Sequence, residues 1–165
     1  MFKKIVLFIL VMFPVIAFAQ EKIAYVNIAD VYVSMPEYKL MQDSLQKSAD
    51  EFQVELKSMS DEYTKKLSDY VAQQDSLNES IKQRRAQEID EIRQRAVNFQ
   101  DTAAQKQDEL QQKLIAPIQD KLQKAINDVG KENNFLYIAN AQAFLYASPT
   151  AVDATPLVKK KLGIQ

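Results

Sequence analysis

The side chains that most often do chemistry in proteins are missing from this sequence or are not arranged for it. The 165 residues contain no His and no Cys, which removes the commonest general base, the commonest metal ligand and all thiolate chemistry. Asp and Glu are spread along polar segments, and no pair of carboxylates stands in an apolar setting. No Gly-rich phosphate loop occurs. We therefore expect no enzyme, no cofactor and no metal.

Two other groups of side chains could bind a partner. Tyr63, Tyr70 and Phe99 recur at helical spacing. Their heptad positions favour packing between helices, and the alternative is that they face a binding cavity. A basic cluster lies near the middle of the chain, with acidic residues between its members. The cluster consists of Lys82, Arg84, Arg85, Arg93 and Arg95.

The first nineteen residues have the layout of a secretory signal peptide. Lys3 and Lys4 form a basic start, an apolar run extends from Ile5 to Ile16, and Ala17-Phe18-Ala19 supplies small residues for signal peptidase. The alternative is a membrane anchor, for which the run is short of the ~20 residues a span needs. We expect cleavage after Ala19. Loss of the two lysines lowers the formal charge from −1 to −3, which argues against nucleic-acid binding.

The long middle of the chain predicts two paired helices. Apolar residues recur at spacings of three and four, which makes a narrow seam typical of a coiled coil. The segment "VAQQDSLNESIK" interrupts this pattern and predicts a reversal near residues 75–80. The expected result is two antiparallel helices at roughly 36–75 and 80–129. The seam residues are Leu45, Ala49, Phe52, Leu56, Met59, Tyr63, Leu67 and Tyr70, then Ile89, Ile92, Ala96, Phe99, Ala103, Leu110, Leu114 and Ile118.

Helix ends are marked by capping residues and by the only two glycines. Ser34-Met35-Pro36-Glu37 fits a capping box at the start of the first long helix. Gly130 and Gly163 each follow a helix-compatible stretch, so both are expected to end a helix. A short last helix is predicted from Pro156 to Leu162.

The ends of the mature chain predict a small sheet. The sequence predicts one strand at residues 22–28. It also predicts a hairpin formed by residues 135–140 and 143–147, with its turn at 140–142. An antiparallel helical pair would bring these segments together, and exposed sheet edges favour pairing with another subunit. The alternative is that the same apolar residues form the core within one chain. The interface candidates are Ile23, Tyr25, Val26, Ile28, Leu136, Ile138, Phe144 and Tyr146.

The predicted fold is mainly α with a small β-body, in which a long antiparallel helical hairpin arm stands on a short-stranded oligomerisation base. We expect the signal peptide at 1–19, the body at 20–34 plus 130–165, and the arm at 35–129. In this predicted architecture and in several sequence segments, the chain resembles the OmpH family of periplasmic chaperones. The resemblance rests on "KIAYVNIADVYVSMPEYK", the Gln/Lys/Glu-rich helical pair, "LIAPIQDKLQKAINDVGKENNFLYI" and "DATPLVKKKLG".

The resemblance implies a homotrimer whose arms project around a central cavity. That cavity would hold unfolded outer-membrane proteins without ATP, through many weak contacts. The best-studied members of the family are strongly basic, whereas this chain is slightly acidic, so we transfer no lipopolysaccharide site and make no prediction of membrane contact. The alternative function is a structural coiled-coil envelope protein that binds no client. The client-binding residues stay unassigned.

Overall fold

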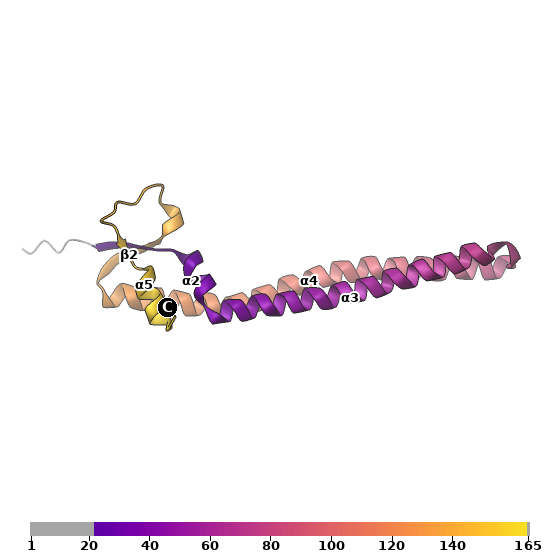
Figure 1. Ribbon diagram of the computed structural model, residues 1–165, viewed down its shortest axis with the longest axis horizontal. Coiled ribbons are helices and arrows are strands. Elements are labelled where there is room, and N and C mark those ends of the chain that lie inside the picture. Colours follow the sequence, from indigo (N-terminus) through magenta and orange to yellow (C-terminus); the bar gives the residue numbers. More distant parts are fainter. Residues whose placement is uncertain (1–21, 165) are drawn as a thin grey trace, which may run out of the picture.

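The computed structural model describes residues 22–164. The predicted signal peptide, residues 1–19, lies outside them. The described chain forms a small base from which one long helical hairpin extends (Figure 1). The elements are β1 (Lys22–Val26), α2 (Ile28–Ser34), α3 (Pro36–Gln73), η2 (Gln74–Ser76), α4 (Glu79–Glu132), β2 (Phe135–Asn140), η3 (Ala141–Ala143), β3 (Val152–Asp153) and α5 (Thr155–Leu162).

We use two names for the parts of this molecule. The arm is α3 with the facing part of α4, residues 36–117. The base is the remainder, residues 22–35 and 118–164, in which α2, the three strands and α5 surround the C-terminal end of α4. The mainly α-helical fold with a small β-containing base agrees with the prediction from the sequence.

The reversal at the tip of the arm is where the sequence predicts it. α3 ends at Gln73, and one turn of η2 leads to Asn78, whose side chain accepts a hydrogen bond of 3.0 Å from the backbone N–H of Ile81. An Asn at this position satisfies one of the free N–H groups at the start of a helix. The polar, turn-forming residues of this segment therefore end one helix and begin the next.

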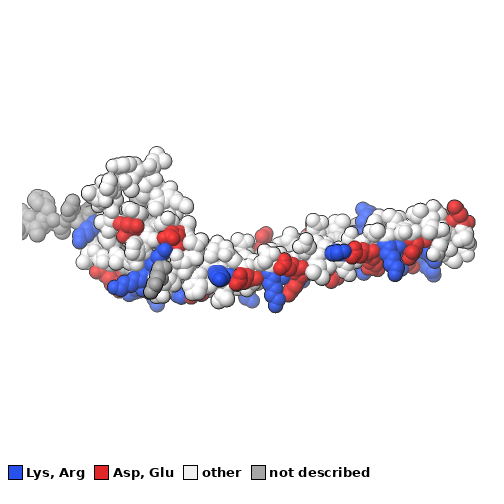
Figure 2. Space-filling view, in the orientation of Figure 1, with Lys and Arg blue, Asp and Glu red and all other residues white. Residues whose placement is uncertain are grey.

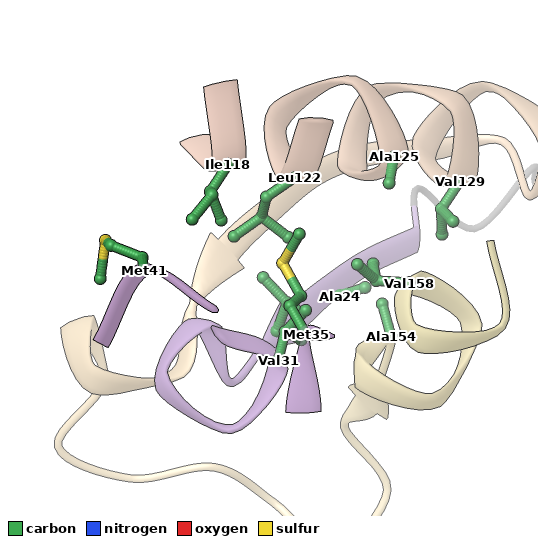
Figure 3. Close-up of a cluster of buried hydrophobic side chains, with 11 residues drawn as sticks. Ala24, Val31, Met35, Met41, Ile118, Leu122, Ala125, Val129, Ala154 and Val158 are labelled. Atoms are coloured by element: carbon green, nitrogen blue, oxygen red, sulfur yellow. The ribbon is translucent and has the colours of Figure 1, made fainter. Parts of the chain in front are cut away.

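The hydrophobic core lies in the base. Eleven buried residues from β1, α2, α3, α4 and α5 form one cluster. Figure 3 shows Leu122 of α4 directed toward Met35, and Val158 of α5 beside Ala24 of β1. The α4 members recur at spacings of three and four, so the end of this helix presents a continuous apolar stripe to the other elements. These members are Ile118, Leu122, Ala125 and Val129.

The strands form a three-stranded parallel sheet in the order β2-β1-β3. The predicted hairpin is therefore wrong in its second strand. Residues 143–147 form no strand, and β2 pairs instead with β1, more than a hundred residues earlier in the chain. The Asn140 side chain accepts from the backbone N–H of Gln142 at 3.2 Å and starts η3, which turns the chain away from a tight hairpin. β1 is the central strand because it alone has a neighbour on both sides.

Two predicted helix boundaries are also wrong. Gly130 lies inside α4, which continues to Glu132, and the left-handed residue that follows is Asn134 at φ 54°. Ser34 closes no capping box, because α2 extends to it and its hydroxyl donates to the carbonyl oxygen of Asp30 at 2.8 Å. Met35 precedes α3 without a side-chain cap.

The last helix agrees with its prediction. α5 runs from Thr155 to Leu162, and Gly163 ends it in the left-handed conformation at φ 75°. Asp153 caps its start, since its carboxylate accepts from the backbone N–H of Thr155 at 2.8 Å. Thr155 is buried and ties α5 to β1, because its hydroxyl accepts from the backbone N–H of Asn27 at 2.9 Å.

Candidate functional site

The two faces of the base sheet have different surroundings. On β1, Ala24 and Val26 are buried against the helices, whereas Ile23 before them is 55 % exposed and Tyr25 between them is half-buried. This alternation follows from the two-residue repeat of a strand. Ile23 lies level with Tyr137 of β2, which is also exposed. The sheet therefore has one face in the core and one outer face that carries exposed apolar side chains.

The segment 141–151 adds a second exposed apolar group beside that outer face. It arches away from the sheet on the side opposite α5 (Figure 1). Phe144 and Tyr146 line a pocket of about 210 Å³ with Ile23 and Tyr25. Leu145 between them is fully exposed. We call this outer face and segment the apolar surface of the base; its large exposed residues are Ile23, Tyr137, Phe144, Leu145 and Tyr146.

The eight predicted interface residues divide between this surface and the core. Ile23, Phe144 and Tyr146 are exposed on the apolar surface of the base, and Tyr25 is half-buried beside them. Leu136 is also exposed, but it lies on the other side of the sheet, where it lines a pocket with Ile138 and Gly130 of α4. Val26 is buried in the core, and Ile28 and Ile138 pack against it. These three residues therefore lie where the alternative interpretation, a core within one chain, places them.

Sequence reasoning missed two of the most exposed members, Tyr137 and Leu145. The hairpin prediction placed Leu145 on the opposite face from Phe144 and Tyr146, because residues alternate in a strand. The segment is not a strand, so all three side chains are accessible together. The signal that could have identified Tyr137 and Leu145 is the concentration of large apolar residues in "FLYIANAQAFLY". This signal does not depend on the secondary structure of the segment.

The basic cluster near the tip of the arm is largely neutralised by neighbours. Arg84 lies 3.7 Å from Glu88, Arg93 lies 2.6 Å from Asp90, and Arg95 lies 3.7 Å from Glu62. Arg85 donates to the side-chain oxygen of Gln73 at 2.8 Å. Because three of the five cations lie near a carboxylate, the cluster carries less net positive charge than its Lys and Arg residues alone would give it.

The aromatic residues of the arm lie in or beside the seam. Phe99 meets Phe52 edge to face, with ring centroids 6.0 Å apart, so the packing interpretation of Phe99 is confirmed. Tyr63 and Tyr70 are half-buried at their heptad positions. Lys66 interrupts the apolar seam between these two tyrosines, and its side-chain nitrogen lies 3.5 Å from a carboxylate oxygen of Glu88 of α4.

Ion pairs connect the elements at the root of the arm. Lys121 of α4 pairs with Glu37 at the start of α3. The hydrogen bond from Lys121 lowers the pKa of the Glu37 carboxyl below its ordinary value. Lys159 of α5 lies 2.9 Å from Asp30 of α2. The first pair joins the base to the arm, and the second joins two helices within the base.

Two further features of residues 22–164 concern metal ions and membranes. No group of three or more acidic side chains could hold a metal ion within these residues. No helix among them is both long enough and apolar enough to cross a membrane. The distinctive surfaces of the described chain are therefore the apolar surface of the base and the sides of the arm.

Comparisons with known proteins place the chain in a family. A solved structure described as a candidate outer membrane chaperone (OmpH-like) from Caulobacter crescentus CB15 has a similar fold, with a TM-score of 0.78 at 14% sequence identity. The match covers 87% of this chain and 85% of that one. No curated protein matches the chain significantly. The model of the family described as outer membrane protein (OmpH-like) matches residues 22–162, and the chain therefore belongs to the OmpH-like family.

Proposed function

We propose that this chain is an ATP-independent periplasmic holdase chaperone. In this proposal three copies form a homotrimer, and unfolded outer-membrane proteins are held in the cavity between the three arms. Membership of the OmpH-like family supports a chaperone role. The trimer, the clients and the mode of holding are what the resemblance to the OmpH family implies.

The observation that carries the proposal is the apolar surface of the base. Exposed apolar side chains gather there beside β2, whose six residues are paired on one side only, by β1. An apolar surface next to an open strand edge is suited to association with another chain. We assign residues 20–34 and 130–165 to a trimerisation body, and residues 35–129 to a helical hairpin that comprises the arm and the adjoining α4 residues 118–129. Leu136, Phe144 and Tyr146 would then be buried between copies.

The form of the arm supports the holding of a client rather than a reaction on it. At about 1.5 Å per residue, the 38 residues of α3 extend about 57 Å from the base. A pair of helices of this length has much exposed surface and a narrow seam. Three such arms around one axis would present many weak contact sites at once, and multivalency would supply the affinity. No nucleotide is needed for such capture.

A structural spacer in the cell envelope is the competing function. Such a protein would use the same base and arm and would bind no client. Family membership shows the fold of the chain and the general role of its family, and does not by itself exclude this function.

Aggregation of an unfolded barrel protein separates the two functions. Mature protein, residues 20–165, is mixed with an outer-membrane barrel protein as the latter is diluted from urea, and light scattering is followed. We expect scattering to be suppressed at close to one trimer per client. Unchanged scattering at a trimer excess would contradict the chaperone function and support the spacer.

A further inference from the structure

The middle of the arm has one charged flank and one flank without charge. Successive residues of a helix are 100° apart, so the residues beside the seam fall on two sides of the helical pair. All residues named here for the two flanks are exposed. The charged flank carries Glu51, Glu55 and Glu62 of α3 with Arg95, Lys106, Glu109 and Lys113 of α4. The uncharged flank carries Gln42, Gln46, Ala49 and Gln53 of α3 with Val97, Gln100, Ala104 and Gln111 of α4.

Contacts between the two helices place the flanks on opposite sides of the seam. Glu62 lies 3.7 Å from Arg95, which joins α3 to α4 along the charged flank. On the other flank the crossing contact is neutral, because the side-chain amide of Gln107 donates to the carbonyl oxygen of Leu45 at 3.0 Å. Figure 2 shows charged side chains along one edge of the arm, while the opposite edge of its middle part is largely uncharged.

The uncharged flank is continuous across both helices. The Phe52–Phe99 contact and the Leu45–Gln107 hydrogen bond fix the register. In this register Ala49 lies close to the level of Ala104, and Gln53 close to that of Gln100. The nearest charge is Asp50, whose carboxylate accepts a hydrogen bond from the side-chain amide of Gln46 at 2.8 Å. Asp50, Lys57 and Asp108 lie further round on the outer side of each helix. A strip of amide and methyl groups therefore runs along the middle of the arm.

Such a strip can receive a polypeptide chain at a low desolvation cost. A charged side chain that is covered by another chain loses hydration that is expensive to replace, whereas an amide can exchange water for a new hydrogen bond. Each Gln offers two donor hydrogens and an acceptor oxygen, which suit the backbone of an extended chain. The side-chain oxygen of Gln107, at the border of this flank, is buried without a hydrogen-bond partner among residues 22–164.

We propose that the uncharged flank is the surface on which each arm holds its client, and that it takes the uncharged, alternating segments of an unfolded outer-membrane barrel protein. Strands of such barrels run for about ten residues with alternating apolar and polar side chains, and charges are unfavourable on their lipid-facing side. This assignment rests on the proposed holdase function. Capture by this flank depends on the absence of charge, so attraction between opposite charges contributes little to it.

Matched glutamine substitutions test the assignment. The flank variant carries Gln42→Glu, Gln53→Glu, Gln100→Glu and Gln111→Glu. The control carries the same number of changes on the outward side of α4, at Gln83, Gln94, Gln105 and Gln112. Both sets change the formal charge by the same amount. Affinity is measured from the fluorescence anisotropy of a labelled, urea-unfolded barrel protein, at low and high salt, after each variant's mass and helicity have been compared with those of wild type.

We expect the flank variant to bind the client about tenfold more weakly and the control to stay within about twofold of wild type. A second flank variant with Lys at the same four positions should also bind more weakly. Tighter binding by the Lys variant together with weaker binding by the Glu variant would overturn the proposal in favour of charge attraction. A changed oligomer mass with client affinity retained would also overturn it, because the flank would then be a contact between arms.

The experiment separates this inference from the function on which it rests. If wild type does not bind or protect the barrel protein, the holdase function fails. If wild type binds it and the flank and control variants bind equally well, the function stands and the assignment of the flank is wrong.

Discussion

The base and the arm share α4 but differ in how their residues are buried. Eleven of the fourteen buried apolar residues belong to the cluster of the base, whereas Ile89, Ile92 and Ala103 are the ones buried in the arm outside it. The base brings five elements together, so its side chains are covered from several directions. The arm has two helices, and each covers only one stripe of the other. The difference indicates that the stability of the chain comes mostly from the base, and that the arm is free to use its surface for contacts.

The strongest test of this difference compares truncations of Leu in the two regions. Leu122 is buried in the base, and Leu56 is half-buried in the seam of the arm. We expect Leu122→Ala to lower the free energy of unfolding by about 2–5 kcal/mol, through lost burial and the cavity it leaves. Leu56→Ala should cost about 1 kcal/mol or less, because partly exposed residues contribute less burial. Urea unfolding at one fixed protein concentration measures both, and equal losses would contradict the comparison.

The apolar surface of the base gives the next largest expected effect. Tyr146 is 79 % exposed in the single chain, so Tyr146→Asp should leave the fold of the chain intact. If this residue is buried between copies, the new charge should weaken assembly by about 1–3 kcal/mol. Sedimentation velocity measures the loss, with Tyr146→Phe as the control that keeps the ring. A Tyr146→Asp protein that sediments like wild type would exclude this residue from the interface.

A smaller effect, of opposite sign, is expected at Gly130. This residue is inside α4, and a methyl group at its Cβ position would meet the side chain of Ile138 at 3.5 Å, an ordinary contact distance. Gly130→Ala should therefore stabilise the base by about 0.5–1 kcal/mol, because Ala loses less conformational freedom in a helix. A rise in the urea midpoint is the expected result. Destabilisation would indicate the left-handed helix end that the sequence suggested.

The smallest expected effect concerns the ion pair at the root of the arm. Lys121 lowers the pKa of Glu37 in the folded chain from its ordinary value of 4.5. The pair therefore stabilises the fold above that pH, and its contribution is lost as the pH falls through the lowered pKa. Because both side chains are partly exposed, we expect less than about 1 kcal/mol. Glu37→Gln should remove this part of the acid sensitivity in unfolding curves at neutral and acidic pH, and an unchanged pH dependence would show that the pair contributes nothing.

Local patterns in the sequence predict the arm well and the base less well. The heptad spacing and the turn-forming residues near Asn78 are short-range signals, and the helices and reversal follow from them. Pairing of β1 with β2 is a long-range contact, and nothing in the spacing of residues 135–147 distinguishes a parallel partner from a hairpin. Ser34 and Gly130 are residue types that often stand at helix ends. Tertiary packing nevertheless extends α2 through Ser34 and α4 through Gly130.

The candidate functional surfaces were likewise predictable only in part. The apolar character of "FLYIANAQAFLY" indicates an exposed surface for contact, yet the members of that surface depend on which residues leave the sheet. The two flanks of the arm need the register between α3 and α4, which the Phe52–Phe99 contact supplies and the sequence alone does not.

The parallel sheet also sets the order in which the chain can mature. Its central strand, β1, is near the beginning of the described chain, and both of its neighbours, β2 and β3, lie beyond α4. During synthesis the first strand must wait until about the last fifth of the chain, from residue 135 on, has been made. The helices of the arm need only each other, and can form before the sheet closes. A chain truncated before residue 135 would thus contain the arm without a complete base. Completion of the base therefore requires that almost the whole chain has been synthesised.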